Sequence, residues 1–242
     1  MVADLVVVVP TRSRPESLHR VVRAWSDTGA FDDGAEIQFL VDADDPRLSE
    51  YESEFGSLRT GQVSLDIMPT WLPLVPKLNS RVVPMAGLGH FAIGFAGDDH
   101  LPRTPGWVAE YVSELRSLRA GIVYPDDGYQ RERLPTSWAM TTDVIRELGR
   151  MVPANVDHLY CDNAVMDLGR AADCITYLPH VLVEHMHPAA GKADVDRQYL
   201  AVNSPEQYAL DRAIYVRWHK TQLPMDAGII RTLREKRDGN PY

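Results

Sequence analysis

The sequence contains few cysteines, no long apolar run and fewer basic than acidic residues. Its two cysteines, Cys161 and Cys174, are too few for a disulfide scaffold or a four-cysteine zinc site, so we expect a reduced, cytoplasmic setting. The 25 Lys and Arg against 34 Asp and Glu give a net charge of -9, which excludes a strongly basic nucleic-acid coat protein. No stretch approaches the roughly 20 apolar residues of a membrane span, and no internal repeat is evident.

Strand-like and helix-like patterns alternate along the chain. A β-branched run over residues 5–9 predicts a buried strand, and apolar residues at helical spacing over 18–25 predict a helix after it. Further strands are expected over 36–41, 63–68, 90–96, 121–124, 137–141 and 181–187. Further helices are expected over 48–55, 77–87, 107–118, 143–149 and 162–172, with helical spacing from about 191 onward. This alternation predicts an α/β fold with a mostly parallel central sheet flanked by helices.

Polar clusters follow three of the predicted strands, at residues 10–12, 42–45 and 97–100. In open sheets of this kind, ligands bind beyond the carboxyl ends of the strands. The adjacent carboxylates Asp98 and Asp99 are costly at the end of a buried strand unless a cation compensates them. Oxygen ligands with one imidazole suit Mg²⁺ or Mn²⁺, which can stabilise charge on a leaving phosphate. The alternative is a solvated acidic turn before Pro102.

These segments together resemble the nucleotide-sugar glycosyltransferases of the GT-A fold, close to the family-two group. Residues 6–15 resemble that family's first strand and nucleotide loop, residues 95–100 its Asp-X-Asp element, and residues 105–107 the continuation of that element. The resemblance covers about residues 5–190 and implies a Rossmann-like GT-A sheet. It implies nucleotide-binding roles for Pro10, Thr11, Arg12, Asp42, Lys77, Asn79 and Asp98.

The Asp-X-Asp element departs from the family pattern at one position. A strict pattern would place Asp at positions 98 and 100, but position 100 is His. We favour Asp99 as the main metal ligand with Asp98 facing the ribose. The open alternative is that His100 supplies a nitrogen ligand.

A second group of candidate ligands lies near the end of the resembling region. On a strand, His185 and His187 point to the same face. The resemblance implies that a late histidine completes the metal shell, so both are candidate metal ligands, and Lys192 is a candidate for pairing with phosphate. The alternative is two partly exposed histidines that bind no ligand.

The resemblance also implies a general base and an acceptor site. Asp162 stands at the start of a predicted helix, where the family places the carboxylate that deprotonates the acceptor hydroxyl. A plain helix N-cap is the alternative for Asp162, and Asp167, on another face, is a weaker candidate base. Trp138 could stack on a sugar or line the acceptor site, or could pack in the core.

The resemblance divides the chain, expected to be one domain over residues 1–242, into three parts. Residues 1–105 form a nucleotide-binding half, residues 106–190 an acceptor and catalytic half, and residues 191–242 a helical C-terminal extension. The basic residues near the end, Arg231, Arg234, Lys236 and Arg237, are interpreted as a solvated helix face.

The activity implied is metal-dependent hexosyl or pentosyl transfer from a nucleoside-diphosphate sugar, with UDP-sugars favoured and Mn²⁺ or Mg²⁺ as cofactor. The runs at 97–100, 184–188 and 191–193 are similar to small glycosyltransferases encoded by actinobacterial phages. That similarity suggests a modified DNA base or a virion protein as acceptor, in the host cytoplasm. Two alternatives stay open. A sugar-nucleotide pyrophosphorylase usually has a Gly-rich loop after its first strand, and residues 10–15 contain no Gly. A noncatalytic nucleotide- or sugar-binding module on the same fold is the other.

Overall fold

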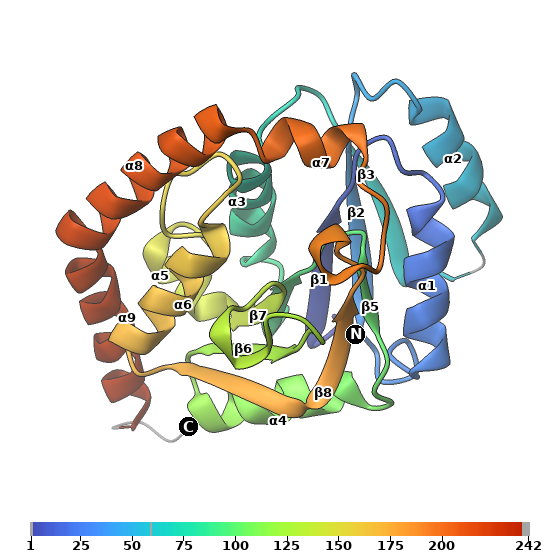
Figure 1. The fold of residues 1–242 in the computed structure, drawn as a ribbon. Coiled ribbons are helices and arrows are strands. Elements are labelled where there is room, and N and C mark those ends of the chain that lie inside the picture. The colour runs from blue at the N-terminus through green and yellow to red at the C-terminus, as the bar shows by residue number, and fades with distance from the viewer. Residues whose placement is uncertain (1, 59, 239–242) are drawn as a thin grey trace.

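The structure is a computed structural model that describes residues 2–58 and 60–238 (Figure 1). Its strands are β1 (Leu5–Pro10), β2 (Glu36–Asp42), β3 (Val63–Met68), β4 (Ala92–Phe95), β5 (His100–Pro102), β6 (Ile122–Asp126), β7 (Trp138–Thr141) and β8 (Ile175–His185). Its helices are α1 (Ser17–Asp27), α2 (Leu48–Ser57), α3 (Leu74–Met85), α4 (Trp107–Leu118), α5 (Thr142–Leu148), α6 (Cys161–Ala171), α7 (Arg197–Val202), α8 (Pro205–Thr221) and α9 (Leu223–Asp238). Two 3-10 turns are η1 (Arg131–Arg133) and η2 (Pro188–Ala190). The predicted α/β class is confirmed.

The strands form one sheet in the order β3-β2-β1-β4-β7-β6-β8-β5. The β1–β2, β2–β3, β1–β4 and β6–β8 pairs are parallel, whereas β7 runs antiparallel to β4 and β6, and β5 runs antiparallel to β8. The sheet is therefore mostly parallel, as predicted. Because β4 pairs with β7, strands from the first 105 residues and from residues 106–190 share this sheet.

The region around β5 and β8 differs from the sequence prediction. The sequence predicted no strand between 96 and 107 and a strand over 181–187, but β5 begins at His100 and β8 ends at His185. The first half of β8 pairs with β6, the register shifts at Pro125 and Asp126, and the end of β8 pairs with β5. In Figure 1, β8 bends between these two pairings. Since the partner of β5 lies more than 80 residues later in the chain, local pattern could not reveal that strand.

Helices cover both faces of the sheet and bury an apolar cluster on each (Figure 1). Residues of α1, α2 and α4 pack on one face, and residues of α3, α5, α6 and α9 pack on the other. Helix α1 buries Leu18, Val21 and Trp25, which share one helical face. The ring of Trp25 meets that of Trp107 edge-on at 5.0 Å, which joins α1 to α4. Every helix among the described residues is too short or too polar to cross a bilayer.

Candidate active site

A cavity of about 550 Å³ opens beyond the carboxyl ends of β1 and β4, with α6 and α7 on its other side. Most of the site residues predicted from the sequence line this cavity: Pro10, Thr11, Arg12, Lys77, Asp98, Asp99, Trp138, Asp162, His185 and His187. Asp42, Asn79 and Lys192 do not line it. Segments separated by up to about 175 residues in the chain thus meet at the edge of the sheet where ligands bind in open α/β folds.

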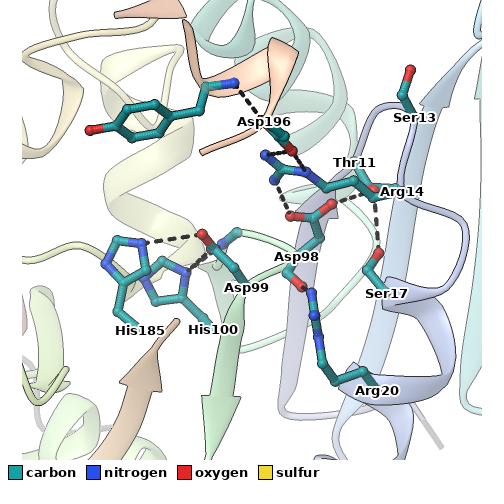
Figure 2. A network of polar contacts seen from close by, with 12 residues as sticks. Thr11, Ser13, Arg14, Ser17, Arg20, Asp98, Asp99, His100, His185 and Asp196 are labelled. Atoms are coloured by element: carbon teal, nitrogen blue, oxygen red, sulfur yellow. Dashed lines mark hydrogen bonds and ion pairs between the residues drawn. The ribbon is translucent and has the colours of Figure 1, made fainter. Parts of the chain in front are cut away.

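Asp98 is held by side chains that follow β1 (Figure 2). Thr11 Oγ1 donates to Asp98 Oδ2 at 2.6 Å, and Arg14 Nη1 donates to Asp98 Oδ1 at 3.0 Å. Arg20 donates to the Asp98 carbonyl at 3.1 Å, and Arg14 also pairs with Asp196 at 2.6 Å. Burial raises the pKa of Asp98, an effect that the positive charge of Arg14 opposes. Arg14 and Asp196 were not among the residues predicted from the sequence.

Asp99 points away from Asp98 and toward two histidines (Figure 2). Its Oδ1 lies 3.0 Å from His100 Nδ1, and its Oδ2 lies 3.4 Å from His185 Nε2. His100 and His185 are register partners in the β5–β8 pair, and their rings stack with centroids 4.0 Å apart. One ligand atom from each of the three residues lies within 4.8 Å of the others, close enough to bind one metal ion together.

The surroundings of this cluster fit a divalent cation. A Cβ atom on Gly97 would lie 2.6 Å from Asp99 Oδ1 and 3.0 Å from His100 Nδ1, so glycine keeps the space beside these atoms open. His100 Nε2 is buried and has no hydrogen-bond partner among the described residues. In this set the carboxylate suits Mn²⁺ or Mg²⁺ and the two imidazoles suit other first-row divalent ions such as Fe²⁺ or Zn²⁺, so the set fits a first-row divalent ion better than Mg²⁺.

Asp127 lies behind the cluster. Its carboxylate accepts hydrogen bonds from the backbone N–H groups of Tyr129 and Arg131, both at 2.8 Å, and lies 3.8 Å from His185 Nδ1. A carboxylate behind a ligating histidine orients the imidazole in many metal sites. Burial lowers the pKa of His185, but its contacts with Asp127 and Asp99 outweigh burial and raise it to about 9. Binding of a divalent ion by His185 would therefore release a proton from its imidazole.

The pKa values of Asp99 and His100 are also shifted by their neighbours in the cluster. Burial raises the pKa of Asp99, but the hydrogen bonds and charges of His100 and His185 lower it well below the usual range. Burial and the neighbouring charge of His185 lower the pKa of His100. The cluster therefore combines an ionised carboxylate with one charged and one neutral imidazole.

His187 lies beside this cluster and outside it. The end of β8 is His185, and the Nδ1 atom of His187 accepts a hydrogen bond from the Ala189 N–H at 3.1 Å at the start of η2. The His187 ring stacks on Tyr129 with centroids 5.5 Å apart. Of the predicted ligands, the structure brings Asp99 and His185 together and adds His100, the alternative left open by the sequence.

Asp42 forms the centre of an ion-pair network next to the cavity. Its Oδ2 accepts from Lys77 Nζ at 2.6 Å and from Arg12 Nη1 at 3.1 Å, and Arg12 also reaches Asp44 at 2.8 Å. Asp42 is fully buried, and its Oδ1 has no hydrogen-bond partner among the described residues. Asp42 thus fixes two cations, Arg12 and Lys77, that line the cavity themselves.

Asn79 and Lys192 make contacts away from the cavity. Asn79 Oδ1 accepts the backbone N–H groups of Met151 and Val152 at 2.9 Å and 3.0 Å. Asn79 therefore links α3 to the loop after α5. Lys192 Nζ lies 3.0 Å from Glu184 Oε1 and lines a separate, open groove beside the turn after β6.

Asp162 lies at the opposite side of the cavity from the β1 loop, in the first turn of α6. The interpretation of Asp162 as N-cap is wrong, because the N-cap is Tyr160, a residue with a positive φ of 64°. Asp162 Oδ1 accepts only the adjacent Asn163 N–H, at 2.9 Å, among the hydrogen bonds of the described residues. Burial raises the pKa of Asp162 to about 6, which suits a carboxylate that accepts a proton near neutral pH.

Trp138 and Asp167 make contacts that stabilise the fold rather than the cavity. Trp138 is 1% exposed and packs on Phe95 with ring centroids 4.6 Å apart, so the core interpretation describes it, although one edge lines the cavity. Asp167 accepts a hydrogen bond from the Tyr215 hydroxyl and lies 3.5 Å from His219 Nε2. Asp167 does not line the cavity.

Comparisons with known proteins agree with this architecture. Neither protein-family models nor curated proteins match the chain, but solved structures do. The mannosyltransferase PcManGT of Pyrobaculum calidifontis, in complex with GDP-Man and Mn²⁺, matches 98% of this chain and 75% of its own at 12% identity and TM-score 0.63. TarS 1-349 of S. aureus, in complex with UDP-GlcNAc, matches 98% of this chain and 73% of its own at 11% identity and TM-score 0.61. This chain has the fold of nucleotide-sugar glycosyltransferases.

Several residues of the site were missed by the sequence prediction. Arg14 and Asp127 follow predicted strands, so the strand-end criterion that selected Arg12 could have selected them as well. The loop over residues 157–160, which lines the cavity beside Asp162, follows no predicted strand. No local pattern in the sequence marks this loop.

Proposed function

We propose that this protein is a metal-dependent glycosyltransferase of the GT-A type, related to family two, that moves a sugar from a nucleoside-diphosphate sugar to an acceptor hydroxyl. The observation that carries the proposal is one cavity lined both by a cluster that can hold a cation, Asp99, His100 and His185, and by a half-buried carboxylate of raised pKa, Asp162. The fold supports it, since nucleotide-sugar transferases share that fold.

The donor binds on the side of the cavity formed by the first half of the chain. Arg12, Arg14 and Lys77 line that side and offer positive charge to a diphosphate. When bound at Asp99, His100 and His185, a divalent ion such as Mn²⁺ supplies charge stabilisation for the departing nucleoside diphosphate. We favour a UDP-sugar as donor.

The acceptor binds on the side of the cavity formed by the second half. The Asp162 carboxylate takes the proton of the acceptor hydroxyl as that oxygen attacks the anomeric carbon. Asp162 is half-buried, and desolvation of its carboxylate raises its pKa to about 6, closer to neutral pH than the pKa of an ordinary aspartate. A hydroxyl on a modified DNA base or on a virion protein stays the predicted acceptor, and the host cytoplasm stays the expected location.

Donor binding and turnover test the proposal. We expect UDP-, GDP- or TDP-sugars to raise the Tm of the protein, with a larger shift when Mn²⁺ is present, and the preferred donor to be hydrolysed slowly or transferred. A Tm shift without any turnover would favour the noncatalytic binding module. Turnover with a sugar phosphate and nucleoside triphosphate would favour a pyrophosphorylase.

Asp99→Ala tests the metal cluster. Loss of the only carboxylate in the cluster should weaken Mn²⁺ binding by at least the 10- to 100-fold typical of altered metal surroundings, and should abolish the Mn²⁺-dependent part of donor binding. Isothermal titration of Mn²⁺ alone and with donor measures both effects. Glu184→Gln is the matched control, because Glu184 pairs with Arg103 and Lys192 outside the cavity. Unchanged Mn²⁺ binding in Asp99→Ala would remove the cluster from the proposal.

A further inference from the structure

Helix α8 packs on the molecule through apolar contacts of Ile214, Tyr215 and Trp218 and through one buried carboxylate, Asp211. Of its 17 residues, Asp211 and Trp218 are buried, and Asp211 is 0% exposed. An isolated carboxylate in such a place is costly, so its hydrogen bonds must compensate the lost hydration. The residues of the proposed donor and metal sites lie elsewhere, in the loops after β1 and β4 and on α3, β5 and β8.

The Asp211 carboxylate accepts three consecutive backbone N–H groups from the loop over residues 157–160. Its Oδ1 accepts from the Asp157 N–H at 2.7 Å, and its Oδ2 accepts from the N–H groups of His158 and Leu159 at 3.1 Å and 2.8 Å. Gln207 Nε2 adds a fourth donor at 3.0 Å. The negative charge of Asp211 is therefore satisfied by the loop it holds.

Two aromatic residues on the same face of α8 hold the next residue of the loop. Tyr208, Asp211 and Tyr215 follow at helical spacing, and the Tyr160 ring stacks on Tyr215 with centroids 5.3 Å apart and meets Tyr208 edge-on at 6.4 Å. Tyr160 has a positive φ of 64°, a conformation that surrounding contacts must impose on a tyrosine. Asp162 follows Tyr160 by two residues, in the first turn of α6.

The other attachment of the loop is to α3. The Val75 N–H donates to the Asp157 carbonyl at 3.0 Å, so the loop is held between the start of α3 and the middle of α8. The loop and α6 join directly, because Tyr160 is the N-cap of α6 and its carbonyl accepts the Ala164 N–H at 3.0 Å. A shift of the loop at residues 157–159 therefore moves the first turn of α6.

We propose that Asp211 is a positioning residue that holds the loop over residues 157–160 and thereby fixes the Asp162 carboxylate at the acceptor side of the cavity. The proposal rests on the proposed function insofar as it assigns Asp162 the role of base. It gives the C-terminal helices a part in the reaction, although no residue of α8 needs to contact the reacting atoms.

Asp211→Asn and Asp226→Asn form a matched pair of variants. The amide of Asn keeps one acceptor oxygen and turns an NH₂ group toward N–H donors, so it cannot replace the contacts of Asp211. Asp226 is also a buried carboxylate, on α9, and accepts from Arg150 at 2.7 Å and 2.8 Å and from Trp218 Nε1 at 2.9 Å. Asp226 does not line the cavity, and it contacts α8 through Trp218 rather than the loop over residues 157–160, so its variant reports on loss of a buried carboxylate that anchors α8 away from that loop.

The first readout is the titration of Asp162 itself, measured by carboxyl ¹³C NMR and assigned by its loss in Asp162→Asn. The parent protein and Asp226→Asn should titrate with a pKa of about 6, and Asp211→Asn should titrate nearer the usual range of aspartate, since a displaced loop exposes Asp162 to water. The charged and titratable groups that interact with Asp162 are unchanged in both variants: Cys161, His185, Tyr208 and Tyr215.

The second readout is kinetic. We expect Asp211→Asn to lower kcat about 100-fold with an unchanged donor Kd, because a displacement of about 1 Å can cost that much. Asp226→Asn should keep kcat while losing Tm. Asp211→Glu keeps the charge but moves it by one methylene, so it should lower kcat with a smaller loss of Tm than Asp211→Asn. This variant serves as the test if Asp211→Asn does not fold.

Two results would overturn the proposal. One is an Asp211 variant that folds, loses only Tm and keeps the Asp162 titration and kcat of the parent. The other is an equal change of the Asp162 titration in Asp226→Asn. If the parent protein turned over no donor, the proposed function would fail, whereas the NMR titration would still decide whether Asp211 fixes Asp162.

Discussion

The two sides of the cavity are built in different ways. On the side formed by the first half, the charged residues neutralise one another: Asp42 pairs with Lys77 and Arg12, and Asp98 pairs with Arg14. On the side formed by the second half, Asp162 accepts one hydrogen bond among the described residues, from its neighbour in the chain, and forms no ion pair with an Arg or Lys among them. The first side therefore holds cations in place for an anionic ligand. The second side holds one carboxylate, Asp162, whose pKa is raised.

The difference shows how a single cavity can serve two reactants. Asp42 and Asp98 hold Arg12, Lys77 and Arg14 in place, so these cations can pair with a diphosphate while they keep their carboxylate partners. A carboxylate with few partners keeps its basicity, because each additional donor would stabilise the ionised form and lower its pKa. The predictions below test whether this division holds.

The largest effect is expected on the second side. Asp162→Asn keeps the size of the side chain but removes its basicity, so sugar transfer should fall about 100- to 10,000-fold. Donor affinity should stay unchanged, because the cations of the first side are intact. Transfer rates under saturating donor, with titration calorimetry for the donor, measure both quantities.

Asp167→Asn is the matched control for this variant. Asp167 contacts Tyr215 and His219 and does not line the cavity, so its variant should keep transfer. Full transfer by Asp162→Asn would show that the second side holds no base, and the division between the two sides would then be wrong.

A smaller effect, on stability, is expected on the first side. Lys77→Met leaves the fully buried Asp42 with Arg12 as its remaining partner. Breaking a buried pair typically costs about 3–5 kcal/mol, and because Arg12 remains we expect about 3 kcal/mol of unfolding free energy to be lost. Urea denaturation measures it. The double variant Asp42→Asn with Lys77→Met should recover most of the loss.

Arg47→Met provides the surface comparison for Lys77→Met. Arg47 pairs with Glu16 and Glu50 on the exposed side of α2, where ion pairs contribute about 0–1 kcal/mol. If Lys77→Met were as mild as Arg47→Met, the charge network around Asp42 would contribute little, and the first side would not differ from the protein surface.

The smallest effect is the change of kcat with each unit of pH. The raised pKa of Asp162, about 6, means that the carboxylate is protonated below pH 6 and cannot accept a proton there. At saturating donor and Mn²⁺, kcat should be constant above about pH 7 and should fall about tenfold per pH unit below 6. The residual activity of Asp162→Asn should lack this limb. A limb that persists in Asp162→Asn would place the titrating group elsewhere, for example among the metal ligands.

Much of the first side could be predicted from the sequence. The β-branched run before Pro10 and the polar residues after the first two strands and β4 indicated a parallel sheet with a ligand at its carboxyl edge, and Thr11, Arg12 and Asp98 do lie there. Such arguments succeed because strand ends are local features and the ends of parallel strands meet at one edge. The same strand-end criterion could have selected Arg14, which also follows the first strand.

The choice of histidine could not be predicted in this way. Strand periodicity placed His185 and His187 on one face, but the β5–β8 register sets His100 opposite His185 and ends the strand before His187. Register between segments separated by 85 positions depends on the packing of the whole sheet, which the local pattern does not contain.

The sequence by itself determined the alternation of strands and helices apart from β5, the strand-end carboxylates and the candidate base, because hydrophobic periodicity and residue chemistry are properties of neighbouring residues. The tertiary structure decided which imidazoles meet Asp99, how Asp42 holds Arg12 and Lys77, and how α8 supports the loop before Asp162. These contacts join residues far apart in the chain. Their energies arise from burial and from hydrogen bonds that exist only after the chain has folded.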